Sequence, residues 1–312
     1  MPTLHRDRIA AIDVGTNSVK LLVADVSAGS VDPVVFRRET SRIGAGIGRT
    51  RRVKRANLTA TTGAIARFVR AARRAGSSKT VAFSTYALRT AVNAPAVLRA
   101  IEQSAGIKVR VLSGREEARF AYLSACRHSS RSRPCALVFD VGGGSTELVL
   151  GCSGSVETWT SLPLGALALT ERFLHADPIS TREYDALCHY ITRRLSKWFA
   201  STSLPEPARL GVVASGGTVT TARSMSMADS TSQHAPLTYA MLRSLEARCL
   251  ALSTAQRKRL PGLATDRADI IPAGVAVVLA ILRLARKRVV DINPGGVREG
   301  VLIHLAQNRL QW

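Results

Sequence analysis

The chain has 312 residues, of which 46% are hydrophobic, so it is long enough to bury the cores of two domains. It carries 44 lysines and arginines against 22 aspartates and glutamates, a formal net charge of +22, yet only 21% of its residues are charged, which excludes a disordered polyelectrolyte. Seven of the basic residues are lysine and the rest are arginine, so the positive charge indicates either phosphate-rich partners or a solvated guanidinium surface.

The first half of the chain alternates predicted strands and helices. Short apolar and β-branched runs predict strands at residues 9–12, 21–25 and 34–37, joined by turns that contain Gly and Ser. Asn57 is expected to cap a long helix that ends near Gly76, because apolar residues recur there at helical spacing. The remaining predicted elements of this half are a strand at 81–84, a helix at 93–106, a strand at 109–112 and a helix from 116 onward.

The opening pattern recurs after the Ser- and Arg-rich segment 128–134, which is the most linker-like stretch. A strand at 136–139, an acidic glycine turn and a strand at 148–150 repeat the start of the chain. Further predicted elements are helices at 166–174 and 181–199, a strand at 210–214, and several helices from there to the C-terminus. The repeat predicts an α/β protein of two domains, residues 1–125 and 126–312, with a cleft between them; the last helix is allowed to pack back on the first domain.

The cysteines and the apolar stretches bear on the cellular compartment. The five cysteines form no C-x-x-C pair and are odd in number, so the sequence suggests neither a zinc cluster nor a complete disulfide framework. The charged start of the chain has no signal-peptide core, and the longest apolar stretch, residues 270–282, is shorter than the roughly 20 residues that a membrane span needs. We therefore expect a cytoplasmic protein with no membrane attachment.

Two acidic glycine turns lie at equivalent places in the two halves. Glycine at such a turn lets successive backbone N–H groups point at one anion, and neighbouring hydroxyls add donors, so phosphate is the expected guest. Asp13 and Asp140 end the preceding strands and would repel phosphate unless a divalent cation lies between them, which makes both candidate magnesium ligands. The competing interpretation is an ordinary hairpin turn, in which Asp and Gly are common. The candidate phosphate-binding residues of the two turns are Gly15, Thr16, Asn17, Ser18, Gly142, Gly143, Gly144, Ser145 and Thr146.

A third glycine turn follows the strand at 210–214 and opens a helix, where N–H groups and the helix dipole favour an anion. Its candidate residues are Ser215, Gly216, Gly217 and Thr218. An ordinary connection between a strand and a helix is the alternative. The chain contains neither G-x-x-x-x-G-K-[ST] nor G-x-G-x-x-G, so the P-loop and Rossmann modes of phosphate binding are excluded.

Eight segments, in order, resemble those of the exopolyphosphatase and guanosine pentaphosphate phosphohydrolase family. They are AAIDVGTNSVKLLVADV, STYALRTAVNA, LSGREEARFAYL, VFDVGGGSTELVLG, SLPLGALALTERF, VVASGGTVTT, DRADIIPAG and GGVREGVL. The resemblance spans nearly the whole chain. It implies two actin-like (ribonuclease H-like) domains, each a mixed sheet with flanking helices, that hold phosphate between two turns in the cleft.

The resemblance also implies roles for individual residues. Glu117 matches the acid that activates the attacking water, and Arg89 matches an arginine that contacts phosphate. An acid in the first turn of a helix that merely complements the helix dipole is the alternative for Glu117, and Glu116 is assigned to that alternative. A plain surface charge is the alternative for Arg89.

The metal site is implied in the same way. Asp140 and Glu147 match the magnesium-associated acids of the family, and Asp13 matches the acid of the first turn. The implied cofactor is Mg²⁺, with room for a monovalent cation. The terminal motif that contains Arg298 is at least as well explained by a structural role.

The function that the resemblance implies is magnesium-dependent hydrolysis of the terminal phosphoanhydride of inorganic polyphosphate by a homodimer. Guanosine pentaphosphate is the nearest alternative substrate, followed by an ATP-dependent sugar or acid kinase and a non-catalytic sensor of polyphosphate or a nucleotide. Nucleic acid is disfavoured, because aromatic residues are few and no RRM, KH or zinc-finger pattern occurs. Basic runs at 49–55, 127–133 and 283–288 would either guide a polyanion or form solvated surface.

Overall fold

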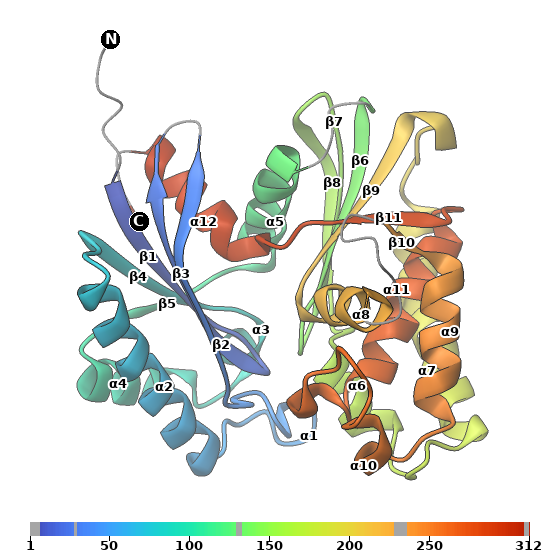
Figure 1. Ribbon diagram of the computed structural model, residues 1–312, viewed down its shortest axis with the longest axis horizontal. Helices are drawn as coiled ribbons and strands as arrows, with labels where there is room; N and C mark the ends of the chain where they lie inside the picture. The colour runs from blue at the N-terminus through green and yellow to red at the C-terminus, as the bar shows by residue number, and fades with distance from the viewer. Residues whose placement is uncertain (1–6, 28–29, 129–132, 228–235, 309–311) are drawn as a thin grey trace. The chain divides into compact units, whose positions relative to one another are not determined.

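The computed structural model describes residues 7–27, 30–128, 133–227, 236–308 and 312 (Figure 1). The chain divides into two compact units, each with its own sheet and helices. Unit 1 contains the described residues up to Ser124 and those from Gly295 onward, and unit 2 contains those from Ala125 to Pro294. Residues 295–312, which the sequence analysis assigned to the second domain, thus pack in unit 1.

Unit 1 is built on a five-stranded sheet in the order β3-β2-β1-β4-β5. Strands β1, β2 and β3 are antiparallel neighbours, whereas β4 is parallel to β1 and β5 is parallel to β4. The strands are β1 (Asp7–Val14), β2 (Ser18–Val26), β3 (Val31–Thr40), β4 (Lys79–Ser84) and β5 (Val109–Val111). The helices are α1 (Ile47–Thr50), α2 (Arg55–Arg74), α3 (Tyr86–Thr90), α4 (Ala94–Ala105), α5 (Gly114–His128) and α12 (Gly296–Gln307).

Both faces of the first sheet are covered, because successive side chains of a strand point to opposite faces. Ala10 and Ile12 of β1 pack in a core with residues of α2 and α4. Ile9 and Ala11 pack in a second core with residues of α5 and α12 (Figure 1). The central strand is therefore apolar throughout, and it delivers Asp13 at its end.

Unit 2 repeats this topology in a six-stranded sheet, whose order is β10-β11-β9-β6-β7-β8. Its strands are β6 (Cys135–Val141), β7 (Thr146–Cys152), β8 (Ser155–Leu162), β9 (Leu210–Ser215), β10 (Leu237–Thr238) and β11 (Val289–Ile292). Read from β8 inward, three antiparallel strands are followed by two that are parallel to β6, as in unit 1. This duplicated order confirms the predicted fold class of two mixed sheets with flanking helices.

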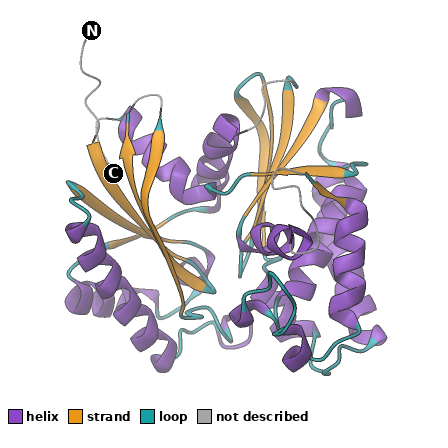
Figure 2. Cartoon of the chain, viewed as in Figure 1, coloured by secondary structure: helices purple, strands orange, loops and turns teal. Residues whose placement is uncertain are grey.

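Helices cover one face of the second sheet, as the colours of Figure 2 show. They are α6 (Ala166–Phe173), α7 (Thr181–Ala200), α8 (Gly217–Met227), α9 (Tyr239–Leu250), α10 (Thr254–Arg257) and α11 (Ile271–Leu284). Leu137, Phe139 and Val141 of β6 point into the core that these helices form. Helix α11 is buried over nearly its whole length, as its continuous apolar sequence requires.

Several sequence-based element predictions were wrong. Asn57 does not cap the long helix; the N-cap of α2 is Lys54, and the Asn57 amide donates to the backbone oxygen of Arg42 at 2.7 Å. Strands β8 and β11 were missed, because β8 is mostly exposed and β11 is only four residues long. A disulfide between Cys135 and Cys152 was not expected either. The helices predicted at 93–106 and 181–199 are confirmed as α4 and α7.

Candidate functional site

The first acidic turn connects β1 to β2 in unit 1. The backbone N–H of Gly15 donates to the Ser18 oxygen at 3.1 Å, and this bond closes the turn. Thr16, Asn17 and Ser18 are all buried, each at most 6% exposed. The segment that follows β3 fixes the turn from outside: Ser41 and Arg42 donate their N–H groups to the Asn17 oxygen, and Gly44 donates to the Thr16 oxygen.

Asp13, the acid of this turn, lies beside a cation. Lys20 is directly opposite Asp13 in the β1–β2 ladder, and its Nζ lies 3.8 Å from Asp13 Oδ2. Asp13 is 9% exposed, so the ammonium compensates a carboxylate that is largely removed from water. The first turn therefore contains a paired acid.

Glu117 and Arg89 lie at the same sheet edge as the first turn. Strands β1, β4 and β5 end together, because Val14 pairs with Ser84 and Ser84 pairs with Val111. Helix α3 follows β4 and carries Arg89, and α5 follows β5 and carries Glu117. Parallel strands present their carboxyl ends at one edge, where ligands of open α/β sheets bind.

Within unit 1, Arg89 and Glu117 form a direct ion pair. Arg89 Nη1 donates to Glu117 Oε1 and, at 2.9 Å, to the backbone oxygen of Leu112. Glu117 is only 3% exposed, whereas the Arg89 side chain is 26% exposed. A buried carboxylate held by a guanidinium that also reaches solvent is well placed to share that guanidinium with an anionic ligand.

Glu116 has a different task from its neighbour. It forms a capping box with Ser113 at the start of α5: the Ser113 N–H donates to Glu116 Oε2 at 2.9 Å, and the Glu116 N–H donates to Ser113 Oγ at 3.2 Å. Burial opposes ionisation of Glu116, but the bonds from Ser113 and the charges of Arg110 and Arg119 outweigh it and hold the pKa of Glu116 below its ordinary value. Glu116 therefore stabilises the helix end.

In unit 2, four polar residues form one row across the sheet. Ser161, Glu147, Asp140 and Ser215 are consecutive register partners on β8, β7, β6 and β9, so their side chains lie on one face. Ser161 Oγ donates to Glu147 Oε1 at 2.7 Å, and Ser215 Oγ donates to Asp140 Oδ2 at 2.6 Å. We call this set the hydroxyl–acid row. Two carboxylates are thus held side by side, each oriented by a serine.

The second turn, residues 142–145, is held by the start of α6. The Gly142 N–H donates to the Ser145 oxygen at 3.0 Å, and Ala166 and Leu167 donate their N–H groups to the oxygens of Gly142 and Gly143, both at 2.9 Å. Gly165 is in such close contact with this turn that a Cβ atom there would lie 2.2 Å from the Gly144 nitrogen.

The hydroxyls of the second turn do not all have the same surroundings. Thr146 is fully buried, and its Oγ1 donates to the Leu164 oxygen at 2.8 Å. Ser145 is 4% exposed and lies at the corner of the turn.

The third turn lies beside the hydroxyl–acid row. Gly216 has a φ of 97°, and a Cβ there would lie 2.7 Å from Asp140 Oδ1, so only glycine fits. Gly217 begins α8, and the Arg267 guanidinium lies against it. Thr218 is buried against Gly274 of α11. Arg267 is 8% exposed and adds positive charge where the N-terminal N–H groups of α8 already favour an anion.

The sequence analysis missed the residues that support these turns. Ser161, Gly165 and Lys20 all lie inside segments that it quoted, and Arg267 lies in the DRADIIPAG segment. None of them has a periodic or motif signal of its own. Their roles follow from strand register and from contacts between distant segments.

The chemistry of the hydroxyl–acid row fits Mg²⁺. No group of three or more His, Cys, Asp and Glu side chains that could hold a metal occurs among the residues that the structure describes. Mg²⁺ does not require one, since it commonly binds one or two carboxylates, waters and substrate phosphates. The neighbouring carboxylates of Asp140 and Glu147 satisfy this requirement, whereas Asp13 is paired with Lys20.

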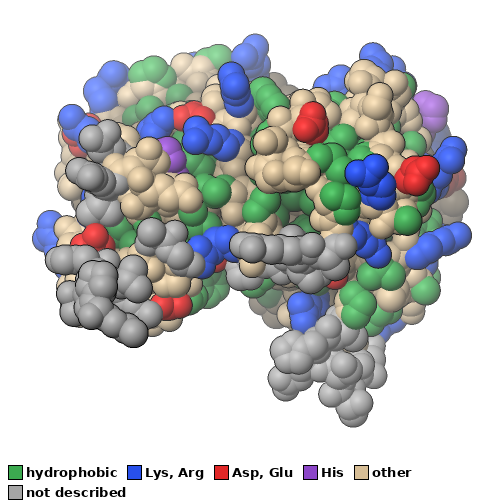
Figure 3. Space-filling model, turned by 90° about the horizontal axis from the view of Figure 1, so that it is seen from above, with side chains coloured by type: hydrophobic (Ala, Val, Ile, Leu, Met, Phe, Trp, Pro, Cys, Tyr) green, Lys and Arg blue, Asp and Glu red, His purple; other side chains and the backbone are tan. Residues whose placement is uncertain are grey.

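The basic runs lie on different parts of the chain. Residues 49–55 span the end of α1 and the start of α2, and residues 283–288 follow the end of α11. Part of the run at 127–133 lies outside the described residues. On the face that Figure 3 shows, Lys and Arg side chains are scattered among other residues.

The described helices were also examined as possible membrane spans. Within the ranges that the structure covers, none combines the length and the apolar character needed to cross a bilayer.

The duplicated fold and its three glycine turns define a protein that handles phosphoryl groups. The chain belongs to the Ppx/GppA phosphatase family, whose model matches residues 22–309. Exopolyphosphatase 1 of Mycobacterium leprae is 32% identical over 302 residues, which cover 95% of this chain and 88% of that protein. Exopolyphosphatase 1 of Mycobacterium tuberculosis is 30% identical over 300 residues, which cover 95% of this chain and 87% of that protein.

Solved structures of the family share the fold. The crystal structure of the Aquifex aeolicus family member superimposes with a TM-score of 0.79 and 26% identity, covering 99% of this chain and all of that one. An exopolyphosphatase from Cytophaga hutchinsonii has a TM-score of 0.89 at 20% identity, covering 97% of this chain and 98% of that one. The second similarity supports the fold alone.

Proposed function

We propose that this chain is an exopolyphosphatase, which uses Mg²⁺ to hydrolyse the terminal phosphoanhydride of inorganic polyphosphate and releases orthophosphate. The observation that carries the proposal is the buried Glu117, held by Arg89 at the edge where β1, β4 and β5 end. The names of the mycobacterial relatives favour polyphosphate over a nucleotide as the substrate.

In the proposed reaction, a water oxygen forms a bond to the terminal phosphorus, and the bond from that phosphorus to the bridging oxygen breaks. Glu117 orients the water and accepts its proton, while the N–H groups of the glycine turns and the Arg89 guanidinium bind the phosphate oxygens. The shortened chain leaves with the bridging oxygen. Phosphoryl transfer needs positioning and charge stabilisation more than covalent help, so no nucleophilic side chain is required.

Asp140 and Glu147 are the residues proposed to hold Mg²⁺, which when bound would neutralise charge on the phosphate. Ser161 and Ser215 orient these carboxylates through the hydrogen bonds of the hydroxyl–acid row. The metal requirement is tested by removing divalent ions with a chelator: phosphate release should stop and should return when Mg²⁺ is added. Undiminished release in excess chelator would contradict it.

The proposed base is tested by Glu117→Gln, with Glu116→Gln as a matched control on the same helical turn. Glu117→Gln should lower turnover of polyphosphate by about 10² to 10⁴-fold while polyphosphate still binds, because only proton transfer is removed. Glu116→Gln should retain turnover, because Glu116 acts in the capping box. Equal turnover in the two variants would remove Glu117 from its proposed role.

The substrate is tested by comparing phosphate release from long-chain polyphosphate and from guanosine pentaphosphate at matched concentrations of terminal phosphate. Polyphosphate should give the higher kcat/KM. A higher kcat/KM for the nucleotide would instead make this chain a guanosine pentaphosphate phosphohydrolase. A double-mutant cycle with Glu117→Gln and Asp140→Asn then asks whether the parts of the site in unit 1 and unit 2 act on one substrate, since residues that act as a unit are strongly non-additive.

A further inference from the structure

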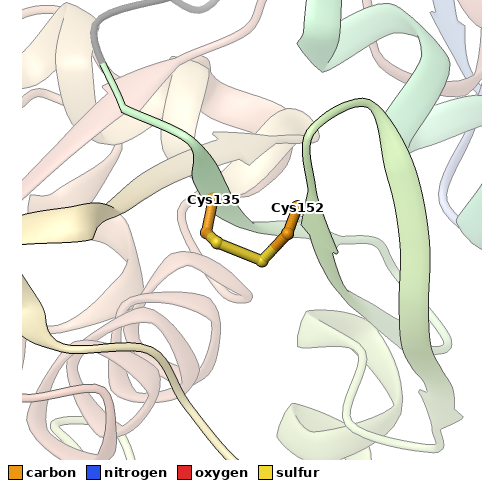
Figure 4. Close-up of a disulfide and its surroundings, with 2 residues drawn as sticks. All are labelled: Cys135 and Cys152. Carbon is orange, nitrogen blue, oxygen red and sulfur yellow. A yellow bond between two sulfur atoms is a disulfide. The ribbon is translucent and has the colours of Figure 1, made fainter.

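A disulfide closes the far end of the hairpin that carries the proposed metal ligands (Figure 4). Cys135 is the first residue of β6 and Cys152 is the last residue of β7, and the two are direct register partners. They are 17 residues apart in the sequence. The other three cysteines, Cys126, Cys188 and Cys249, form no disulfide.

The two sulfurs differ in their access to solvent. Cys135 is 6% exposed and belongs to the core of unit 2, whereas Cys152 lies at the rim of that core and is partly exposed. An incoming thiolate therefore meets the sulfur of Cys152 first. Attack there makes Cys135 the leaving group, because thiol–disulfide exchange expels the sulfur that is not attacked.

Cations lie close to the leaving sulfur's strand. The backbone oxygen of Leu210, the partner of Cys135 in β9, accepts from Arg133 Nη1 at 2.8 Å and from Lys287 Nζ. Burial and the charge of Arg133 both lower the pKa of Lys287, as expected for two cations held together. Positive charge beside a cysteine favours its thiolate, and a stabilised thiolate leaves faster.

Opening the disulfide leaves the rest of the hairpin in place. Strand β6 is bonded to β7 and β9, and β7 is bonded to β6 and β8, so both are interior strands. The Asp140–Glu147 pair lies five residues further along each strand, at roughly 17 Å for a rise of about 3.4 Å per residue. It also lies on the opposite face of the sheet, since five is an odd number of residues. The acids therefore stay in register when the sulfurs separate.

We propose that Cys135–Cys152 is a redox-active disulfide that exchanges with low-molecular-weight thiols and sets the thermal stability of unit 2 without changing the chemistry at the acids. A thiolate RS⁻ attacks the Cys152 sulfur, forms a mixed disulfide with it and releases Cys135 as a thiolate, which takes up a proton. A second RSH attacks the mixed disulfide, so RSSR leaves and Cys152 becomes a thiol. Two thiols thus supply the two electrons that reduce the protein.

The disulfide is first tested by counting thiols in the denatured full-length chain, purified without reductant. Three thiols are expected before reduction and five after it. The native protein is then equilibrated with mixtures of reduced and oxidised glutathione, and a single two-electron transition is expected within that series. Five thiols before reduction, or a disulfide that stays closed throughout the series, would overturn the proposal.

The direction of attack is tested with single-cysteine variants. After incubation with oxidised glutathione, Cys135→Ser should carry one glutathione on Cys152, identified by peptide mass spectrometry. In the matched variant Cys152→Ser, the buried Cys135 should remain unmodified. Modification of Cys135 in preference to Cys152 would contradict the proposed order. Peptide mapping separates both from any adduct on the exposed Cys126.

The consequence is tested on the oxidised and reduced forms of the same protein. Reduction should lower the melting temperature by on the order of 5 to 10 °C, because a loop of this length no longer restricts the unfolded chain. The initial rate of phosphate release from polyphosphate at 25 °C should change less than twofold. An unchanged melting temperature, or a tenfold change in rate, would overturn the proposal. The thiol count, the adduct and the melting temperature remain decisive even if the chain does not hydrolyse polyphosphate.

Discussion

Replacing Gly165 by alanine should damage the second turn through steric overlap alone. Gly165 is the N-cap of α6, with φ −83° and ψ 148°, a conformation that alanine adopts freely. The added Cβ would lie 2.2 Å from the Gly144 nitrogen and 2.3 Å from the carbonyl carbons of Gly143 and Gly144. These are backbone atoms, so no side chain can rotate away.

The size of the effect follows from those distances. Ordinary contact begins at 3.4 Å, so the turn and the start of α6 must move apart by about 1 Å. That movement stretches the bond from the Ala166 N–H to the Gly142 oxygen, now 2.9 Å. Overpacking of this kind costs about 1 to 3 kcal/mol, and a displacement of about 1 Å at a reacting group can cost about 10²-fold in rate.

Two measurements check Gly165→Ala against Gly211→Ala, a control in the same unit. A Cβ at Gly211 would have its nearest contact at 3.6 Å and would require no rearrangement. Gly165→Ala should lower the melting temperature by roughly 2 to 4 °C per kcal/mol and reduce kcat/KM for phosphate release by about 10²-fold. The control should change neither. If both variants behave like the wild-type protein, the close approach between α6 and the turn is not needed.

Three further substitutions have outcomes that the contacts define. Ser161→Ala removes the hydroxyl that orients Glu147, so the apparent affinity for Mg²⁺, measured by titrating phosphate release, should fall about 10 to 100-fold; an unchanged titration would show that Glu147 needs no support. Tyr184→Phe removes the phenol that donates to the buried Glu246, and chemical denaturation should show a loss of about 1 to 3 kcal/mol, whereas full stability would mean that another donor replaces it. Because the pKa of Glu116 is lowered in the folded state, this residue stabilises the protein above its ordinary value of 4.5, and that stabilisation is lost as the pH falls through the folded-state pKa. The difference in unfolding free energy between the wild-type protein and Glu116→Gln should therefore shrink on acidification below pH 4.5, and a constant difference would refute the assignment.

The sequence was informative wherever the structure depends on neighbouring residues. The two strand–turn–strand segments and the caps of α4 are local, so composition and spacing were sufficient to predict them. Strand β8 was missed because its exposed, polar residues lack the alternation of a half-buried strand. With β8 went the role of Ser161, which depends on the register between β7 and β8.

The disulfide shows where a signal was present but not used. The register that places Asp140 opposite Glu147 also places Cys135 opposite Cys152, since both pairs are symmetric about the same turn. Counting outward from that turn would have predicted the pairing. An argument from the total number of cysteines does not contain this register.

The same limit applies to the acids of the site. The sequence named Asp13 and Asp140 as equivalent, but their partners across the hairpin are Lys20 and Glu147. A cation opposite the first acid and an anion opposite the second give the two turns different chemistry. That distinction depends on pairing, which the motif alone does not state.

The interrupted sequence of unit 1 has a consequence for synthesis on the ribosome. Strands β1 to β5 emerge early, but one face of their sheet is completed by Val301, Leu302 and Leu305 of α12, which are translated last. Unit 2 is continuous, so all of its residues are available before α12 leaves the exit tunnel. The nascent chain must therefore carry an uncovered apolar face while its middle section matures, and a chaperone that shields such faces would act on the portion made first.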